Sequence, residues 1–402
     1  MRLLKYVYKY FFKYILIIIL FYALAPLTIT PFYKFPQPQL FKGDSLYNPY
    51  SDINKGKWYK GNFQIQTKSW GGLTDGSKSP VDEAYDLYHS LGYDILAISD
   101  YQKINTYNSG SESYVPTYEH GYNTFKTHMV CICASKVNWW DYVLYHTINT
   151  KQFIINLLRD DCRTLVLAHP AFANAYYVDD MKYLSNYNCI EVFNKQAYSV
   201  EYWDTALSTG HPAFLIANDD SHDINNTNAN GVVITYLNMS ELNQNNITNA
   251  LNTGRTYAFL PYVPHNESYE VRKKKMKDYA KLLDFTVKHE KISLKLSKKA
   301  KEIRFVGQNG EVKQIVENKK NADYKFLASD TYIRTEIVFE NKDEMYLNPV
   351  FRYKSDPLKM PEVKINVFKT ILYRLGLIIL LVIAYVVLKK YLLIRKATKK
   401  TK

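Results

Sequence analysis

Carboxylate and imidazole side chains recur along the first half of the chain, each beside a predicted strand. Glu119 lies in the run TYEH, His128 begins the run HMVCIC, and His169 follows the run TLVLA. Asp220 and His222 belong to the segment NDDSHD, which follows the apolar run AFLIA. Two histidines and a carboxylate with one open position form a known catalytic zinc pattern. These residue types therefore predict a divalent metal site for zinc, manganese or iron.

A second group of residues surrounds the predicted first strand, in the stretch NFQIQTKSWGGLTDG of residues 62–76. Gln64 and Gln66 are two residues apart, so on a strand they point to the same face. Asp75 lies in the glycine-rich loop that follows, and Tyr101 follows a later strand. An amide oxygen is a weaker ligand than imidazole for zinc or manganese. A tyrosine ligates a metal only after losing a proton whose ordinary pKa is near 10.

The order of these motifs resembles the PHP family (polymerase and histidinol phosphatase) over roughly residues 58–260. Family members open with a His-x-His pair, which Gln64 and Gln66 replace here. Tyr101 stands where the family has a histidine after the aspartate of a Thr/Ser-Asp-His motif. Glu119 matches the metal-bridging glutamate of the family.

In family members with three metals, the resemblance assigns each ion its own ligands. The first ion would use the lost His-x-His pair with Glu119 and Asp220. The third would use the loop near Asp75, the position of Tyr101, and His222. The second ion would use Glu119 with the two middle histidines, His128 and His169, and only this set is complete. The resemblance therefore implies about one divalent ion per chain.

Two functions of different classes remain open. The resemblance implies a metal-dependent phosphoesterase, a hydrolase acting on a phosphorylated small molecule, with Asp220 or His222 positioning water or the leaving group. The loss of three imidazoles instead favours a catalytically inactive PHP pseudoenzyme that acts as a binding or scaffold module. Glu191, at the end of a predicted strand, either faces the site or forms a structural ion pair. Trp70 is either a pocket wall or a loop anchor, and His120 should point away from Glu119.

Strands and helices alternate over residues 57–262, which predicts an α/β domain with a mainly parallel sheet. We expect a distorted (β/α)7-type PHP barrel, with the chemistry at the C-terminal ends of its strands. Residues 263–282 predict a charged helical linker, and residues 283–355 predict a small β-sandwich-like domain. Within that domain, Asn309-Gly310 is a strong hairpin signal.

Two apolar segments near the ends, residues 14–33 and 371–393, predict transmembrane helices. A signal peptide is the alternative for the first, and a helix lying on the membrane surface is the alternative for the second. The tails, residues 1–13 and 394–402, are basic, which predicts cytoplasmic termini and an extracytoplasmic main domain. Residues 34–56 read as the linker from the membrane to that domain.

The formal net charge of +14 is concentrated at the two ends of the chain. Eleven Lys and Arg residues, and no acidic residue, lie in residues 1–14 and 389–402. The middle is therefore close to neutral, and we expect no nucleic-acid partner. The four cysteines lack zinc-ligand spacing, and we expect them to be small buried side chains.

Overall fold

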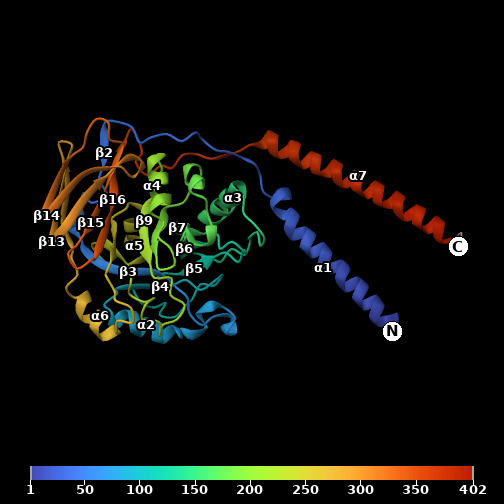
Figure 1. Cartoon of the computed structure of the whole chain (residues 1–402), viewed down its shortest axis with the longest axis horizontal. Coiled ribbons are helices and arrows are strands. Elements are labelled where there is room, and N and C mark those ends of the chain that lie inside the picture. The colour runs from blue at the N-terminus through green and yellow to red at the C-terminus, as the bar shows by residue number, and fades with distance from the viewer. Residues whose placement is uncertain (1, 401–402) are drawn as a thin grey trace.

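The structure is a computed structural model that describes residues 2–400; the side chain of Asp75 and several near the two ends lie outside the description. Within that range, the helices are α1 (Arg2–Thr28), α2 (Val81–Ser90), α3 (Ile148–Arg159), α4 (Val200–Ser208), α5 (Gln244–Asn252), α6 (Tyr269–Met276) and α7 (Val367–Lys400). Strands β13, β14 and β15 lie on one side of the molecule, and α1 and α7 leave it on the opposite side (Figure 1).

One sheet has five strands in the order β5-β6-β7-β8-β9. Its members are β5 (Thr117–His120), β6 (Met129–Ala134), β7 (Cys162–Leu167), β8 (Cys189–Asn194) and β9 (Phe214–Asn218). All residues of β5, β6, β8 and β9 are buried. Such nearly continuous apolar runs are typical of strands that are covered on both faces.

The other large sheet has ten strands. Its main path runs β12 (Leu282–Lys288), β13 (Lys291–Val306), β15 (Tyr332–Val338), β16 (Glu344–Tyr353), β11 (Thr256–Leu260), β10 (Ile234–Met239), β3 (Lys57–Ile65) and β4 (Ile95–Ile98). Off this path, β14 (Val312–Lys325) pairs with β13 and β2 (Ser45–Tyr47) pairs with β16. The predicted hairpin is confirmed, because Asn309 and Gly310 connect β13 to β14 with positive φ.

The strands of residues 283–355 share this sheet with the α/β part of the chain. Residues 257–260 of β11 pair antiparallel with residues 344–347 of β16. The expected β-sandwich is thus the outer part of a common sheet. Pairing with β16 satisfies backbone groups of β11 that would otherwise form an open edge.

The two sheets meet around the end of β3. Isolated bridges join Ile65 to Ser221 and Tyr101 to Glu119. These bridges bring seven strands, β3 to β9, around one space, but continuous ladders do not close the ring, so the expected barrel is not confirmed.

The expectation of a mainly parallel sheet was wrong, since only β3–β4, β7–β8 and β8–β9 pair in parallel among the described strands. Residues 121–128 between β5 and β6 are fewer than the dozen or so that a parallel crossover needs.

Two hydrophobic cores stabilise these layers. One core packs the five-stranded sheet against α3, α4 and α5, with Trp203 as its largest fully buried side chain. The other packs α2 and the strands of residues 283–355 around Tyr257 and Phe259. The four cysteines are free and buried, as expected.

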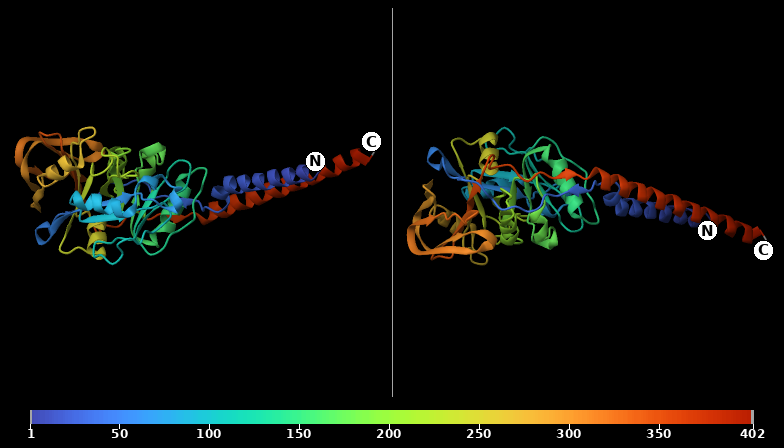
Figure 2. Two further views of the ribbon diagram at one scale, coloured as in Figure 1. Left: turned by 90° about the horizontal axis from the view of Figure 1, so that it is seen from below. Right: turned by 90° about the horizontal axis from the view of Figure 1, so that it is seen from above.

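The two end helices leave the molecule from the same place. The short strands β1 (Tyr33–Lys34) and β17 (Lys364–Ile365) pair antiparallel at their base. Above this pair the ring of Phe32 packs on Tyr373, and the guanidinium of Arg374 donates to the carbonyl of Ile29. Figure 2 shows α1 and α7 extending in the same direction from this base, so both chain ends lie at the far end of the pair.

Among the described residues, one helical stretch is long and apolar enough to cross a membrane, Val367–Tyr391 of α7. In the part of α1 whose side chains are described, the apolar stretch is Tyr10–Phe21, which alone is shorter than a bilayer span. The expected boundaries therefore change. The first helix ends at Thr28 rather than at residue 33, because Pro31 cannot continue a helix and the chain turns into β1. The last helix is longer than residues 371–393 at both ends.

Candidate metal centre

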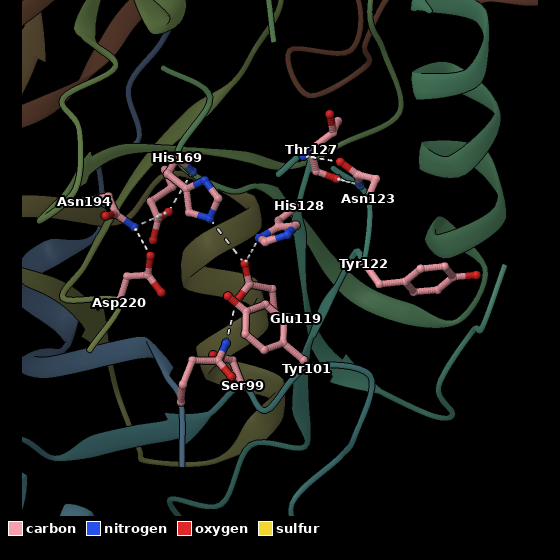
Figure 3. A network of polar contacts seen from close by, with 12 residues as sticks. Ser99, Tyr101, Glu119, Tyr122, Asn123, Thr127, His128, His169, Asn194 and Asp220 are labelled. Carbon is pink, nitrogen blue, oxygen red and sulfur yellow. Dashed lines mark hydrogen bonds and ion pairs between the residues drawn. The ribbon is translucent and has the colours of Figure 1, made fainter. Parts of the chain in front are cut away.

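Glu119, His128 and His169 converge although they are far apart in the chain. Glu119 is on β5, His128 directly precedes β6, and His169 follows β7 by two residues, so three neighbouring strands position them. Oε1 of Glu119 lies 2.5 Å from Nδ1 of His128 and 3.2 Å from Nε2 of His169. All three side chains are buried, and their ligand atoms lie within 4.8 Å of one another (Figure 3). The fold thus assembles the set that the sequence predicts.

This donor set fits a small divalent cation. Metal–ligand distances of about 2.0–2.1 Å in a tetrahedron place neighbouring ligand atoms about 3.3 Å apart. The Glu119–His169 separation of 3.2 Å already has that value, and the Glu119–His128 separation of 2.5 Å would open slightly. Two imidazoles and a carboxylate suit zinc, manganese or iron. We therefore regard this group as a candidate site for one such ion.

The electrostatics of the group show what holds it together without an ion. Burial alone would raise the pKa of Glu119, but the adjacent His128 and His169 hold that pKa well below its usual range. Burial alone would lower the pKa of His169, but its hydrogen bond to Glu119 and the charge of Asp220 raise it to about 9. Glu119 is therefore ionised and His169 protonated near neutral pH. In the absence of a metal ion, the additional proton on His169 balances the charge of Glu119.

Gln66 caps the other oxygen of the same carboxylate. Its Nε2 donates to Oε2 of Glu119 at 2.5 Å. An ionised carboxylate only accepts hydrogen bonds, so the nitrogen of the amide must face it. Two residues earlier, on β3, both amide atoms of Gln64 are buried and have no hydrogen-bond partner among the described residues. A buried amide of this kind marks a place for a polar ligand or water.

Tyr101, Asp220 and His222 line the space beside the three ligands. The hydroxyl of Tyr101 lies 3.4 Å from Nε2 of His222, and its ring packs edge-on against His128. Nδ1 of His222 lies 2.8 Å from the carbonyl oxygen of Asp220, which can only accept, so Nδ1 carries a proton. Oδ1 of Asp220 is buried with no hydrogen-bond partner in the described part of the chain. Asp220 and His222 lie outside the three-residue ligand group but border the same cavity.

A buried amide and carboxylate network supports the site from behind. Oε2 of Glu191 accepts from the backbone N–H of His169 at 2.8 Å and from Asn194 at 3.0 Å, and its Oε1 accepts from Asn218. Asn194 also donates to Oδ2 of Asp220 (Figure 3). His169 and Asp220 have positive φ angles of 29° and 49°, which are costly for residues with a Cβ. Glu191 thus supports the site through these hydrogen bonds and not through the ion pair named as its structural alternative, and its network holds two strained positions.

Burial also changes the ionisation of this supporting carboxyl. It raises the pKa of Glu191 to about 7, against the opposing effect of His169. Asn194 and Asn218 were not singled out in the sequence. Their only signal in the sequence is their position at the ends of β8 and β9, because functional side chains of α/β folds collect at the C-terminal ends of strands.

The remaining predicted residues have simpler outcomes. The Asp75 side chain lies outside the described residues. Nε2 of His120 bonds to the carbonyl oxygen of Trp140, so the ring points away from the ligand group as expected. Trp70 is a loop anchor, because its indole N–H donates to the carbonyl oxygen of Tyr101 at 2.8 Å.

A cavity of about 320 Å³ opens directly onto His128, His169, Asp220 and His222. Its wall includes Lys126 and Lys195, and neither ammonium has a carboxylate partner among the described residues. Lys126 and His128 also line an adjoining cavity of about 260 Å³. The sequence offered no signal for either lysine, because the chain is rich in surface lysines and only the fold brings these two to the site.

Comparison with known proteins adds little to this description. No family model matches the sequence, and no curated protein matches it. A crystal structure from Bacteroides vulgatus, of a two-domain protein described as containing a predicted PHP-like metal-dependent phosphoesterase, is similar with a TM-score of 0.40 and 12% identity. The similarity covers 81% of this chain and 98% of that one. A likeness of this size carries no argument, and the site itself has to support any function.

Proposed function

We propose that this chain is a membrane-anchored, metal-dependent phosphoesterase with one metal site of the PHP kind. The observation that carries the proposal is the convergence of Glu119, His128 and His169 beside a cavity that the two histidines line together with Lys126 and Lys195. A phosphate ester needs positive charge around its oxygens and an activated water, and this cavity offers groups for both.

Glu119, His128 and His169 would hold the ion, which when bound polarises the phosphoryl group and lowers the pKa of water. Lys126 and Lys195 would compensate the negative charge of the substrate at the mouth of the cavity. Oδ1 of Asp220, which has no hydrogen-bond partner among the described residues, would accept a proton from an attacking water. Nε2 of His222, whose ring is oriented by the contact of Nδ1 with the carbonyl oxygen of Asp220, would serve the leaving group.

The ends of the chain support a membrane location. Val367–Tyr391 is long and apolar enough to cross a bilayer, and α1 leaves the molecule beside it. We infer that α1 also enters the membrane, and that the basic tails hold both termini in the cytoplasm. The cavity then lies outside the cytoplasmic membrane, with a phosphorylated molecule as substrate and no role for nucleic acid.

A binding module without turnover is the second candidate, and one pair of contacts favours it. Gln66 bonds Glu119, and Tyr101 approaches His222, so two residues at lost ligand positions now contact residues of the site. These contacts stabilise the pocket, and the residues that make them are weaker metal ligands than the histidines that the family has at these positions. A phosphate ligand would then be bound at the lysines and not hydrolysed.

Hydrolysis and binding are separated by one assay on the purified full chain. After loading with Mn²⁺ or Zn²⁺, the protein should release phosphate from p-nitrophenyl phosphate, and His169→Ala should abolish this activity. His289→Ala is the matched control, because His289 is exposed in the turn between β12 and β13. Loaded protein that binds phosphate esters without releasing phosphate would contradict the enzyme and support the binding module.

A further inference from the structure

Large apolar side chains are exposed in residues 70–73 and 122–144, and the mechanism does not use them. The second of these segments also contributes Tyr122 and Lys126 to the cavity beside His128. We call these exposed side chains the aromatic rim. Its side chains are 40–90% exposed and comprise Trp70, Leu73, Tyr122, Phe125, Trp139 and Leu144. Contiguous exposed apolar groups of this kind typically mark an interaction surface.

Direct contacts join three members of the rim, Trp70, Trp139 and Tyr122, and Tyr122 connects them to the cavity. The rings of Trp70 and Trp139 pack edge-on with centroids 5.7 Å apart. The hydroxyl of Tyr122 donates to the carbonyl oxygen of Trp139 at 2.8 Å, and Tyr122 itself lines the smaller cavity beside His128. Phe125 directly precedes Lys126, the lysine that lines both cavities.

The same loops contact the base of the two end helices. The hydroxyls of Tyr142 and Thr30 lie 2.6 Å apart, and Thr30 follows the last residue of α1 by two positions. The backbone N–H of Tyr33 donates to the side chain of Asn149 at the start of α3. The segment that carries much of the rim, residues 122–144, is therefore attached to the point from which α1 and α7 leave (Figure 1).

We propose that the aromatic rim rests on the lipid bilayer that α7 enters, so that the metal cavity opens toward the headgroup layer. Trp and Tyr are enriched where protein meets the membrane–water interface, because their rings are apolar and their N–H and O–H groups stay hydrated. The contacts of the rim with the helix base place it on the membrane side of the molecule. The phosphoester that reaches Lys126 is then part of the headgroup of a membrane lipid.

This inference rests on the proposed function for its substrate class, but its docking surface can be tested alone. The full chain, with Leu73→Cys or Phe125→Cys carrying a nitroxide spin label, would be reconstituted into phosphatidylcholine–phosphatidylglycerol vesicles. Ile315→Cys is the matched control, because Ile315 is an exposed apolar residue on β14, on the side away from the helices. The native cysteines are buried, and the unsubstituted chain gives the background label.

For each label we compare the rate of collision with lipid-soluble oxygen with the rate of collision with a water-soluble nickel chelate. The ratio of these two rates should be several-fold higher for the labels at residues 73 and 125 than for the label at residue 315. Equal ratios at the three positions would overturn the docking. So would immobilised labels that neither reagent reaches, because these indicate a protein partner or a second copy. Labels in water on a chain that binds metal and hydrolyses p-nitrophenyl phosphate would refute the docking alone. Labels in lipid on an inactive chain would refute the phosphoesterase alone.

Discussion

Gln66 and His169 contact opposite oxygens of one buried carboxylate, that of Glu119. Oε1 of Glu119 faces the two imidazoles, whereas Oε2 accepts the amide N–H of Gln66 at 2.5 Å. A glutamate that bridges two ions through separate oxygens needs Oε2 free for the second ion. Because the amide of Gln66 contacts Oε2, we predict that Glu119 serves a single ion.

The bond from Gln66 to Glu119 should be measurable as stability. Gln66→Ala leaves Oε2 of Glu119 buried without a donor, which costs about 1–3 kcal/mol. Gln64→Ala is the matched control, because Gln64 is also buried but its amide has no hydrogen-bond partner among the described residues. Urea unfolding of the metal-free chain should therefore show a larger loss for Gln66→Ala. Equal losses would show that the short bond contributes nothing.

Metal binding should compete with a proton on His169. Because the pKa of His169 is raised to about 9, its ion pair with Glu119 stabilises the metal-free protein below about pH 6.5 and is lost as the pH rises through 9. An ion must displace that proton, so its apparent affinity should fall about tenfold per pH unit below about 9. Calorimetric titration with Zn²⁺ in buffers of different ionisation enthalpy would measure the protons released. Binding without proton release at pH 7 would contradict the assignment.

Acid should destabilise the fold through two buried histidines outside the ligand group. Burial lowers the pKa of His120 and of His211 to about 4, so both stay neutral in the folded chain while the unfolded chain takes up protons below about 6.5. The free energy of unfolding should therefore fall as the pH drops from 6.5 to 4, by up to about 3 kcal/mol per histidine. His211→Gln should reduce that fall in denaturant titrations, whereas the exposed control His289→Gln should not. A pH dependence unchanged by His211→Gln would contradict this prediction.

The pairing of β1 with β17 predicts that the two tails share one side of the membrane. Both helices start from the same base and extend in the same direction (Figure 2). Epitope tags added at each end should be protected together when protease is applied to intact cells, while the central region is cleaved. A tag exposed at one end only would contradict the two-helix anchor and leave α7 as the sole span.

The ligand group could be predicted from the sequence because it depends on local signals. Glu119, His128 and His169 each lie at one end of an apolar run. They meet because β6 is antiparallel to β5 and β7, which brings the start of β6, with His128, to the edge where the other two strands end. Strand direction itself could not be read, since apolar runs look alike in parallel and antiparallel sheets. The shared ten-stranded sheet depends on contacts such as that between residues 257–260 and 344–347, which are far apart in the sequence.

The partners around the ligands were also beyond the sequence. The bond from Gln66 to Glu119 depends on the approach of β3 to β5, and no pattern in either strand signals it. Lys126 and Lys195 resemble any other surface lysine until the fold places them at one cavity. The first end helix was placed too far along the chain because apolar composition continues past Thr28, whereas the position of Pro31 indicated its end.

The metal content of the purified full chain tests the central claim most directly. After loading with Mn²⁺ or Zn²⁺ and removal of excess ion, elemental analysis should give about one ion per chain, because one ligand group is complete among the residues that the structure describes. His169→Ala should bring the content close to zero, and the triple variant Gln64→His, Gln66→His, Tyr101→His should raise it. Two or three ions on the unmodified chain would contradict the capping role of Gln66. No ion under any loading condition would contradict the metal centre itself.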